Sequence, residues 1–429
     1  MNRPATPTGD HRLLAAWSDT GRPDSYDAHL ARHGNPPNAD GRAWRERLIA
    51  EVTHSGLGGR GGAGFPTGRK LAAVAAGRGR KVVVANGCES DPGTHKDRVL
   101  AQYSPHLILD GALMAAAALH TNDIFLCAHR DGPTYQALGQ ALTQRPDADR
   151  FSLVDIPARF VASEESSLAN FLSGGDARPT SKPPRVFESG VAGRPTLVSN
   201  IETLAHISLI ARYGAEWFRS LGTGPSPGTA LVTVGGAVRT PGVLEVAYGA
   251  ALPDLVASVG GASEPLQALL IGGYSGCWVP DSVARTLHFS HEELRAAGTT
   301  VGVGSVLALP AGACGIAETA RILSYLAGES ASQCGPCMFG LPAITADFAA
   351  MASGAGANDR ALAARLQGRL SVIAGRGACG HPDGAVRLAE SALRTFAVDV
   401  DAHLHGRPCR GAGALPFLPI PRRPLSLVG

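Results

Sequence analysis

The sequence of 429 residues predicts an α/β fold, followed by a small β-rich module and a C-terminal helical bundle. Two apolar runs, Lys81 to Asn86 and Ile124 to Ala128, have the length of buried strands and enclose an apolar helix at Leu107 to His120. This alternation is typical of a mostly parallel sheet. After Gly228 the pattern changes to two β-rich runs, a helix and a strand, and from Ala317 to Ala397 it is largely helical.

The α/β domain is expected over residues 43–225. Residues 1–42 are rich in Pro, Gly, Asn and Asp and predict a partly ordered extension. The domain opens with a helix whose apolar face carries Trp44, Leu48 and Val52, together with Ile49, and Gly56 is placed to end it.

The second half of the chain predicts four further parts. The ββαβ order over residues 226–282 predicts a β-grasp-like module, which a connecting segment at 283–324 joins to the helices. Residues 325–405 predict a helical bundle that carries the cysteines Cys334, Cys337 and Cys379, and residues 406–429 form a Pro-rich tail.

The composition, charge and cysteine count of the sequence disfavour several classes of protein. A formal net charge of +3 and scattered arginines disfavour nucleic acid as a partner. The apolar runs fall short of a membrane span, and the N-terminus lacks the apolar core of a signal peptide, so a cytoplasmic location is expected. Eight cysteines are too few for a disulfide scaffold in a chain of this length, and the pair Cys334 and Cys337 indicates metal or redox chemistry.

The loop GLGGRGGAGFPTG, Gly56 to Gly68, matches the G-x-G-x-x-G dinucleotide fingerprint in letters but not in context. A helix precedes it where a strand is needed, and it has no Walker A register. Its glycines allow backbone N–H groups to approach an anion, and Arg60, Arg69 and Lys70 add positive charge. Composition alone leaves a phosphate or cofactor cradle and a plain connector equally open.

The amino-acid sequences of this loop and of five later blocks resemble those of one protein family. The blocks, in family order, are GLGGRGGAGFPTGRK (56–70), ANGCESDPGTHKDR (85–98), SEESSLANFLSG (163–174), SKPP (181–184), GRPTLVSNIETL (193–204) and CGPC with ACGHPDGA (334–385). They resemble the NADH-oxidising flavoprotein subunit of respiratory complex I and the diaphorase subunits of NAD-linked hydrogenases and formate dehydrogenases. The resemblance extends from about Ala43 to Gly406.

The resemblance implies an FMN-binding Rossmann-like α/β domain, a β-grasp module of the ubiquitin-like SLBB type, and a helical bundle that holds an iron–sulfur cluster. It implies hydride transfer from NADH to FMN N5, followed by single-electron release through the cluster to a protein acceptor. No catalytic side chain is required, because the reaction runs between cofactors. The family positions assigned here to the flavin and NADH are Gly59, Arg60, Gly61, Gly62, Gly64, Phe65, Lys70, Asn86, Glu89, Asp91, Glu164, Glu165, Lys182, Ser199 and Asn200.

Glu165 occupies the family position associated with discrimination against NADPH, since a carboxylate repels a 2′-phosphate. Without the flanking match, Glu164 and Glu165 would read as an exposed acidic pair at a helix start. Asp91 stands where the family has Glu.

The family's cluster motif is incomplete in this chain. Relatives ligate [4Fe-4S] with C-x-x-C-x-x-C and one distant Cys. Cys334, Cys337 and Cys379 match three of these ligands, whereas the first position is Ala331. Three thiolates allow a [3Fe-4S] cluster, a [4Fe-4S] cluster completed by Ser332, water or another residue, or the relic of a lost site, because buried Cys is also common without any metal.

The nucleotide site also departs from the family. Phe65 is kept, but Ala73 and Arg185 replace aromatic residues around the adenine, so NADPH is also possible. Further departures are Gly58, Cys88, Phe160 and Ser163.

These departures indicate a divergent paralogue that delivers electrons to a ferredoxin or a membrane reductase subunit. The alternative is a non-catalytic scaffold subunit of a redox complex.

Overall fold

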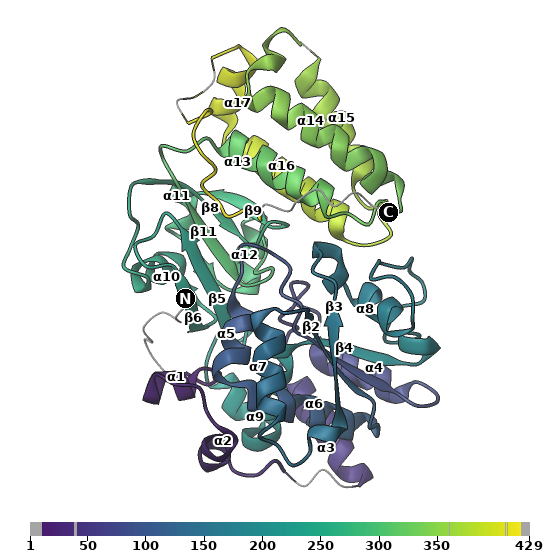
Figure 1. The fold of residues 1–429 in the computed structure, drawn as a ribbon. Coiled ribbons are helices and arrows are strands. Elements are labelled where there is room, and N and C mark those ends of the chain that lie inside the picture. Colours follow the sequence, from purple (N-terminus) through teal and green to yellow (C-terminus); the bar gives the residue numbers. More distant parts are fainter. Residues whose placement is uncertain (1–10, 38–40, 360, 408, 410, 422–429) are drawn as a thin grey trace.

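The computed structural model describes residues 11–37, 41–359, 361–407, 409 and 411–421 (Figure 1). The parts of the expected extension and tail at residues 1–10, 38–40 and 422–429 lie outside the described residues. Within the extension, helices α1 (Ala15–Thr20) and α2 (Tyr26–His33) form, and Leu13 and Leu14 are buried in the core of the first domain. No helix of the described part has both the length and the apolar character of a membrane span.

Four parallel strands form the first sheet: β1 (Val82–Asn86), β2 (Ile124–His129), β3 (Phe151–Ile156) and β4 (Thr196–Asn200). Their order is β3-β2-β1-β4. The two predicted strands and their parallel pairing are therefore confirmed. Because β2 and β3 lie on one side of β1 and β4 lies on the other, the strand order reverses direction between β1 and β4.

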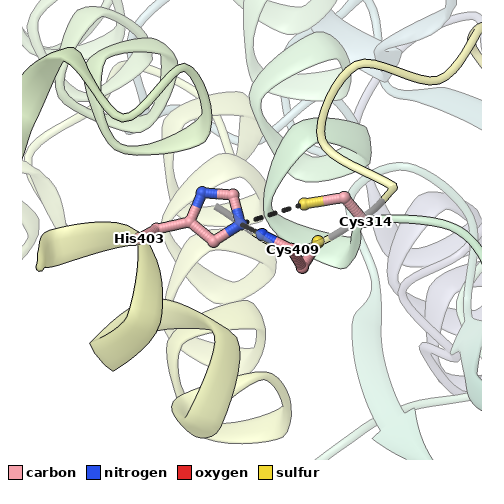
Figure 2. A group of neighbouring side chains, drawn as sticks. All are labelled: Cys314, His403 and Cys409. Carbon is pink, nitrogen blue, oxygen red and sulfur yellow. Dashed lines mark hydrogen bonds between the residues drawn. The ribbon is translucent and has the colours of Figure 1, made fainter. Parts of the chain in front are cut away.

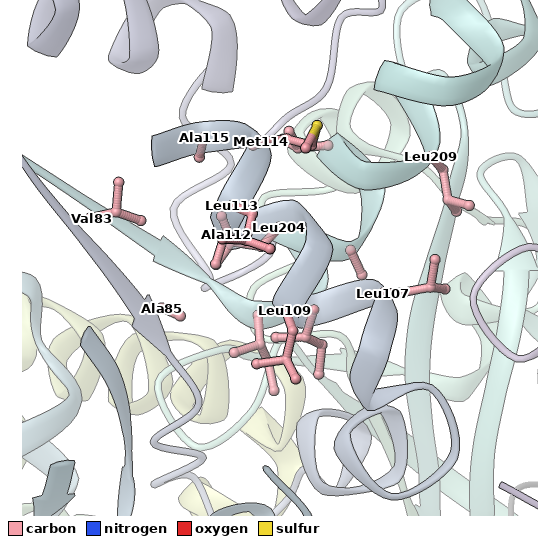
Figure 3. Packing of buried hydrophobic residues seen from close by; sticks show 14 of the residues in the cluster. Val83, Ala85, Leu107, Leu109, Ala112, Leu113, Met114, Ala115, Leu204 and Leu209 are labelled. Carbon is pink, nitrogen blue, oxygen red and sulfur yellow. The ribbon is translucent and has the colours of Figure 1, made fainter. Parts of the chain in front are cut away.

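Alternate residues of β1 serve different cores, since successive side chains of a strand point to opposite faces. Val83 and Ala85 face a large core with helices α3 (Arg42–His54), α4 (Thr67–Ala76), α5 (Lys96–Tyr103), α6 (Pro105–Leu119), α7 (Pro133–Leu142) and α9 (Ile201–Arg219) (Figure 3). Val82 and Val84 face a smaller core that includes Leu168 of α8 (Glu165–Leu172).

The closest helix pair is α6 with α9. A Cβ at Gly111 would collide with the carbonyl group of Leu204, so glycine is what lets the two backbones approach. α9 is interrupted at Gly214, whose φ of +85° is costly for other residues.

The second sheet has five strands in the order β6-β5-β11-β8-β9. They are β5 (Thr229–Gly236), β6 (Gly242–Ala247), β8 (Leu266–Ile271), β9 (Cys277–Pro280) and β11 (Ser305–Pro310). β11 lies at the centre, parallel to β5 and antiparallel to β8. The sequence placed residues 305–310 in a connecting segment, but they complete the sheet that begins at Thr229.

Short elements complete this part of the molecule. They are β7 (Ala250–Ala251), α10 (Leu252–Ser258), α11 (Asp281–Ala284), β10 (His288–Phe289) and α12 (His291–Ala296).

The C-terminal helices pack together beside the second sheet, at the top of Figure 1. They are α13 (Gly315–Gly328), a π-helical turn η4 (Pro336–Gly340), α14 (Leu341–Ala352), α15 (Leu362–Ile373), α16 (His381–Thr395) and α17 (Ala397–Leu404). Trp278 of β9 joins them to the sheet: its backbone N–H donates to Ser391 Oγ and its indole N–H donates to Thr319 Oγ1, each at 3.0 Å.

Candidate functional site

The glycine-rich loop connects α3 to α4 and closes on itself. The N–H of Gly59 donates to the carbonyl of Phe65, and the N–H of Thr67 donates to that of Leu57, both at 2.9 Å. The loop also lies close to the second sheet, because a Cβ at Gly62 would contact Val303 and one at Gly64 would crowd His291. Gly62 and Gly64 have φ values of +112° and +61°. Their lack of a side chain is therefore needed for conformation, and at Gly64 it also avoids a tight contact with His291.

Arg60 points into the protein. Its guanidinium donates to the carbonyls of Gly58 (3.1 Å) and Thr229 (2.9 Å), lies 3.6 Å from Glu202 and stacks over Tyr248. The side chain is 4% exposed, so this charge clamps the loop to the second sheet. The expectation that Arg60 supplies free positive charge to an anion does not fit these contacts.

Two asparagines mark the place where the order of the parallel sheet reverses. Asn86 ends β1, Asn200 ends β4, and the two are paired in register. Asn86 Nδ2 donates to the carbonyl of Ser163 (2.9 Å), and Asn200 Nδ2 donates to Asp97 Oδ2 (2.7 Å). In open α/β sheets, ligands bind outside the carboxyl ends of the strands at such a switch point. The topology therefore indicates a binding site at these two amides.

A buried ion network lies directly beside the switch point. Lys96 Nζ is 2.6 Å from Asp97 and 2.8 Å from Glu202, and its side chain is 3% exposed. Burial alone would lower the pKa of Lys96, but the two carboxylates outweigh it and raise that pKa above its usual range. Glu202 also accepts from the N–H of Leu231 in β5, at 2.9 Å. This network fixes the switch point to the second sheet, and Lys96 is a residue that the sequence interpretation missed.

Two further carboxylates stand on the loop after β1. Glu89 accepts from the N–H groups of Asp97 (3.0 Å) and Arg98 (3.3 Å), and so holds the start of α5. Asp91 accepts from the N–H groups of Gly93 (2.8 Å) and Tyr274 (2.7 Å). Burial raises the pKa of Asp91 to about 6, against the effect of these two hydrogen bonds.

These features surround one cavity of about 550 Å³ between the first sheet, the second sheet and the C-terminal helices. Its volume is within the range of cofactor sites. Backbone forms much of the wall: the glycine loop provides Gly61 and Gly62, and Gly302 packs so close to Gly272 that a Cβ would not fit. A flat ring system with polar edges fits a cavity built of close backbone, two asparagine amides and paired charges.

The residues predicted for the flavin and NADH fall into two groups. The cavity lining includes Arg60, Gly61, Gly62, Asn86, Glu89, Asp91, Glu164 and Asn200. Outside this lining lie Gly59, Gly64, Phe65, Lys70, Glu165, Lys182 and Ser199. The assignment of both groups to the cofactors stays a prediction. Lining residues that the prediction did not include are Ser90, Thr94, Lys96, Asp97, Gly272, Cys379, His381 and Arg387.

Glu164 and Glu165, at the start of α8, form ion pairs with two lysines. Glu165 lies 3.0 Å from Lys70 and 3.4 Å from Lys182, and Glu164 lies 2.8 Å from Lys182. Burial would raise the pKa of Glu165, but Lys70 and then Lys182 hold it below its usual range. Glu164 also caps α8 by accepting from the N–H groups of Ser166 and Ser167. The pair is thus part of a mixed-charge cluster rather than a free acidic surface.

The three cysteines of the incomplete cluster motif come together. Burial is the main cause that raises the pKa of the Cys337 thiol to about 12, and the Cys334 and Cys379 thiols contribute to this rise. Cys337 is buried in the π-helical turn, whereas Cys334 and Cys379 are partly exposed. Cys379 also lines the cavity described above, so cavity and cysteines share a wall.

Polar groups flank Ala331, the position where the family has its first Cys ligand. Ala331 is 8% exposed and lies between Ser330 and Ser332, whose hydroxyls are 3.2 Å apart. His381, two residues after Cys379, donates from Nε2 to the carbonyl of Leu326 at 2.8 Å, and its buried Nδ1 has no hydrogen-bond partner among the described residues. Three thiols with such neighbours fit an iron–sulfur cluster with one iron that has no Cys ligand.

The raised pKa of Asp91 predicts a pH dependence of stability. In the folded protein this carboxyl takes up its proton as pH falls through about 6, whereas an unfolded Asp does so near 3.9. The folded state therefore binds more protons between these values, and the free energy of unfolding contributed by Asp91 increases as pH falls from about 6 to about 4.

We expect Asp91→Asn to remove this gain, which is on the order of 2 to 3 kcal/mol. Urea unfolding of both proteins between pH 4 and pH 7 measures it, and the difference between the two curves isolates Asp91 from other carboxyls. Parallel curves for the two proteins would show that Asp91 does not titrate in this range.

Comparison with known proteins shows which proteins this chain is similar to. Residues 52–209 match the model of the Nuo51 FMN-binding domain, and residues 317–403 match that of the NADH-ubiquinone oxidoreductase-F iron-sulfur binding region. The chain is 29% identical over 382 residues to the F 2 subunit of NADH-quinone oxidoreductase of Rhizobium meliloti (strain 1021), covering 85% of this chain and 90% of the relative. It is 30% identical over 382 residues to the F subunit of NADH-quinone oxidoreductase of Streptomyces coelicolor, covering 84% of each.

A solved structure shows the same likeness. A chain in the crystal structure of an NAD⁺-reducing [NiFe]-hydrogenase in the air-oxidized state superimposes with a TM-score of 0.82 at 30% identity. The match covers 94% of this chain and 68% of that one.

Proposed function

This chain belongs to the family of the F subunits of NADH-quinone oxidoreductases, and from that premise we propose that its cavity is the site where NADH is oxidised. The protein is an FMN- and iron–sulfur-dependent NADH oxidoreductase. One observation supports this assignment of the site. Cys379, a cysteine of the cluster motif, lines the same cavity as the amides of Asn86 and Asn200.

The residues present fit both groups. When bound, FMN supplies a hydride acceptor at N5 for NADH and releases single electrons to the cluster. For the flavin, Asn86 and Asn200 offer amides at the switch point, and Gly61 and Gly62 leave room for a ring. For the cluster, Cys334, Cys337 and Cys379 offer three thiolates.

The chain's own task is to hold and orient these groups. Lys96, paired with Asp97 and Glu202, keeps the switch point rigid and brings one cation to the cavity wall. Asp91 lines the cavity as a hydrogen-bond acceptor suited to a ribose hydroxyl, and Glu89 shapes the wall by fixing the start of α5. Gly272, Thr300 and Val303 complete the cavity wall from the second sheet's side.

We further propose that the protein works in the cytoplasm as a subunit that passes electrons to a protein acceptor. A ferredoxin or a membrane reductase subunit suits the chemistry, and of the three cluster cysteines Cys334 and Cys379 are partly exposed to such a partner. The second sheet, with its α10 and its ββαβ start, is proposed to be a β-grasp module of the SLBB type, and helices α13 to α17 are proposed to be the cluster-binding bundle.

Anaerobic purification, reconstitution with FMN and titration with NADH test the proposed function. We expect a flavin absorbance that NADH bleaches, together with iron and acid-labile sulfide. Flavin without iron would restrict the protein to a diaphorase. If no flavin bound after reconstitution, the scaffold alternative would replace the enzyme.

Glu165 is predicted to favour NADH over NADPH. Glu165→Ala removes a negative charge and also frees Lys70 from its ion pair, so one cation becomes available to a 2′-phosphate, whereas Lys182 keeps its pair with Glu164. We expect the ratio of kcat/KM for NADPH to that for NADH to rise about tenfold, equivalent to about 1.4 kcal/mol. Asp176→Ala removes an exposed carboxylate from the same region and serves as the control. An unchanged ratio would place Glu165 away from the adenosine ribose.

A further inference from the structure

A second cysteine cluster lies at the far end of α13 from the iron–sulfur cysteines. Cys314 precedes α13, His403 lies on α17, and Cys409 follows in the tail (Figure 2). One ligand atom of each lies within 4.8 Å of the others. Cys334 follows the opposite end of α13, and a helix of 14 residues is about 21 Å long. This set, the Cys314–His403–Cys409 site, is therefore separate from the cluster motif.

The distances within the site agree with one tetrahedral ion. Zinc binds sulfur at about 2.3 Å and imidazole nitrogen at about 2.0 to 2.1 Å, so tetrahedral geometry separates S and N ligands by about 3.6 Å. Cys314 Sγ lies 3.6 Å from His403 Nε2. The limit of 4.8 Å for all three atoms also accommodates the sulfur–sulfur separation of about 3.8 Å that this geometry gives.

The imidazole is held in the tautomer that a metal needs. His403 Nδ1 lies 3.0 Å from the carbonyl of Met351, which can only accept, so Nδ1 carries the proton and Nε2 carries the lone pair. A carbonyl that orients the imidazole through its other nitrogen is the usual outer-shell arrangement of zinc-bound His. Nε2 now accepts from the N–H of Cys409 at 3.1 Å, a contact that a metal would replace.

Burial raises the pKa of the Cys314 thiol, while the start of α13 acts in the opposite direction. Cys314 is the N-cap of α13, and its Sγ accepts from the N–H of Ala317 at 3.3 Å. A helix N-terminus stabilises negative charge, which a metal-bound thiolate carries. Cys314 and His403 are 1% and 0% exposed, while Cys409 is partly exposed and leaves a side open to a fourth ligand. Buried Cys and His in this grouping select a soft or borderline cation rather than calcium or magnesium.

We propose that Cys314, His403 and Cys409 bind one zinc ion, with a water molecule as the fourth ligand. The ion joins the start of α13 to α17 and to the tail. The tail then continues across the protein, where the N–H of Phe417 donates to Glu318 at 2.9 Å and Leu418 is buried among the helices. Zinc thus fixes the C-terminal segment against the helices that hold the iron–sulfur cysteines.

Metal analysis of the full chain, purified without chelators from zinc-supplemented cells, tests the proposal. We expect about one zinc per chain in addition to the iron, and its loss in Cys314→Ser, His403→Gln and Cys409→Ser with flavin retained. Cys277→Ser removes a buried cysteine elsewhere and keeps the zinc. The variant with Cys334, Cys337 and Cys379 all changed to Ala loses iron but keeps zinc, which separates this site from zinc misplaced in the cluster motif.

Cobalt provides a direct view of the ligands. The Co²⁺-loaded protein is expected to show the visible bands of tetrahedral cobalt and sulfur-to-cobalt charge transfer, and Cys409→Ser should weaken the latter. Because His403 and Cys314 are buried, the partly exposed Cys409 is the variant least prone to misfold. A protein that binds neither zinc nor cobalt overturns the proposal. So does a count of six rather than eight thiols in the unfolded, metal-free chain, which would indicate a disulfide between Cys314 and Cys409.

Discussion

Lys96→Met is expected to lower the free energy of unfolding by about 3 to 5 kcal/mol and to release FMN. The cation lies between Asp97 and Glu202, and all three side chains are at most 6% exposed. Removing it leaves the buried Asp97 without a counter-charge and Glu202 with only Arg60, 3.6 Å away, which costs far more than the lost attraction. Urea unfolding measures the first effect, and flavin fluorescence after gel filtration measures the second.

Lys182→Met is the matched control. Lys182 also pairs with two carboxylates, Glu164 and Glu165, but its side chain is 30% exposed. Water replaces such a partner, so we expect a loss of at most about 1 kcal/mol. Glu202→Gln combined with Lys96→Met should recover part of the stability, because it removes one of the two carboxylates that lost Lys96. Equal losses for Lys96→Met and Lys182→Met would show that burial of the network does not set its energy.

Ala331→Cys is expected to make the iron–sulfur cluster resistant to air. In a [4Fe-4S] cluster held by these three thiolates one iron would have no Cys ligand, so exposure to air should remove that iron and give [3Fe-4S]. Position 331 matches the family's first ligand position and is buried. A thiolate there completes the set. Iron and sulfide content against time in air, with electron paramagnetic resonance of both forms, measures the change.

The isosteric control for that experiment is Ala331→Ser, which adds a hydroxyl of nearly the same size but a poorer iron ligand. We expect it to lose iron as the natural chain does. If the natural chain kept its iron in air as well as Ala331→Cys does, the fourth iron would already have a strong ligand, and His381 would be the first residue to replace.

The parallel sheet was predictable because buried strands carry continuous apolar runs, as in residues 82–86 and 124–128. Strand β11 was missed although residues 305–309 are S-V-L-A-L, bounded by Gly304 and Pro310. The local sequence pattern indicates a strand, but it does not show which other strands pair with it. Its partners in β5 and β8 lie tens of residues earlier in the chain, and nothing in residues 283–324 reveals that they meet at the centre of a sheet.

Site residues were predictable from sequence where they belong to a family motif. They were less predictable where the role of a charged residue depends on its ion-pair partners in the folded protein. The family blocks contain Asn86, Asn200 and the three cysteines, and the structure places Asn86, Asn200 and Cys379 around one cavity. Arg60 was expected to serve an anion, yet its guanidinium is used within the protein. Lys96 stood in a quoted block without being chosen, because sequence does not show that two carboxylates enclose it. The Cys314–His403–Cys409 site has no local spacing signal at all.

The central position of β11 has a consequence for how the chain is made. Until residues 305–310 leave the ribosome, β5 and β6 form one hairpin and β8 and β9 form another, with no strand between them. Isolated hairpins are at best marginally stable, and the unpaired edges of β5 and β8 are open to other chains. The second domain thus depends on a late, long-range pairing step, which is slow and exposed to aggregation. A nascent chain stalled just before Ser305 is the form of this protein that most needs a chaperone.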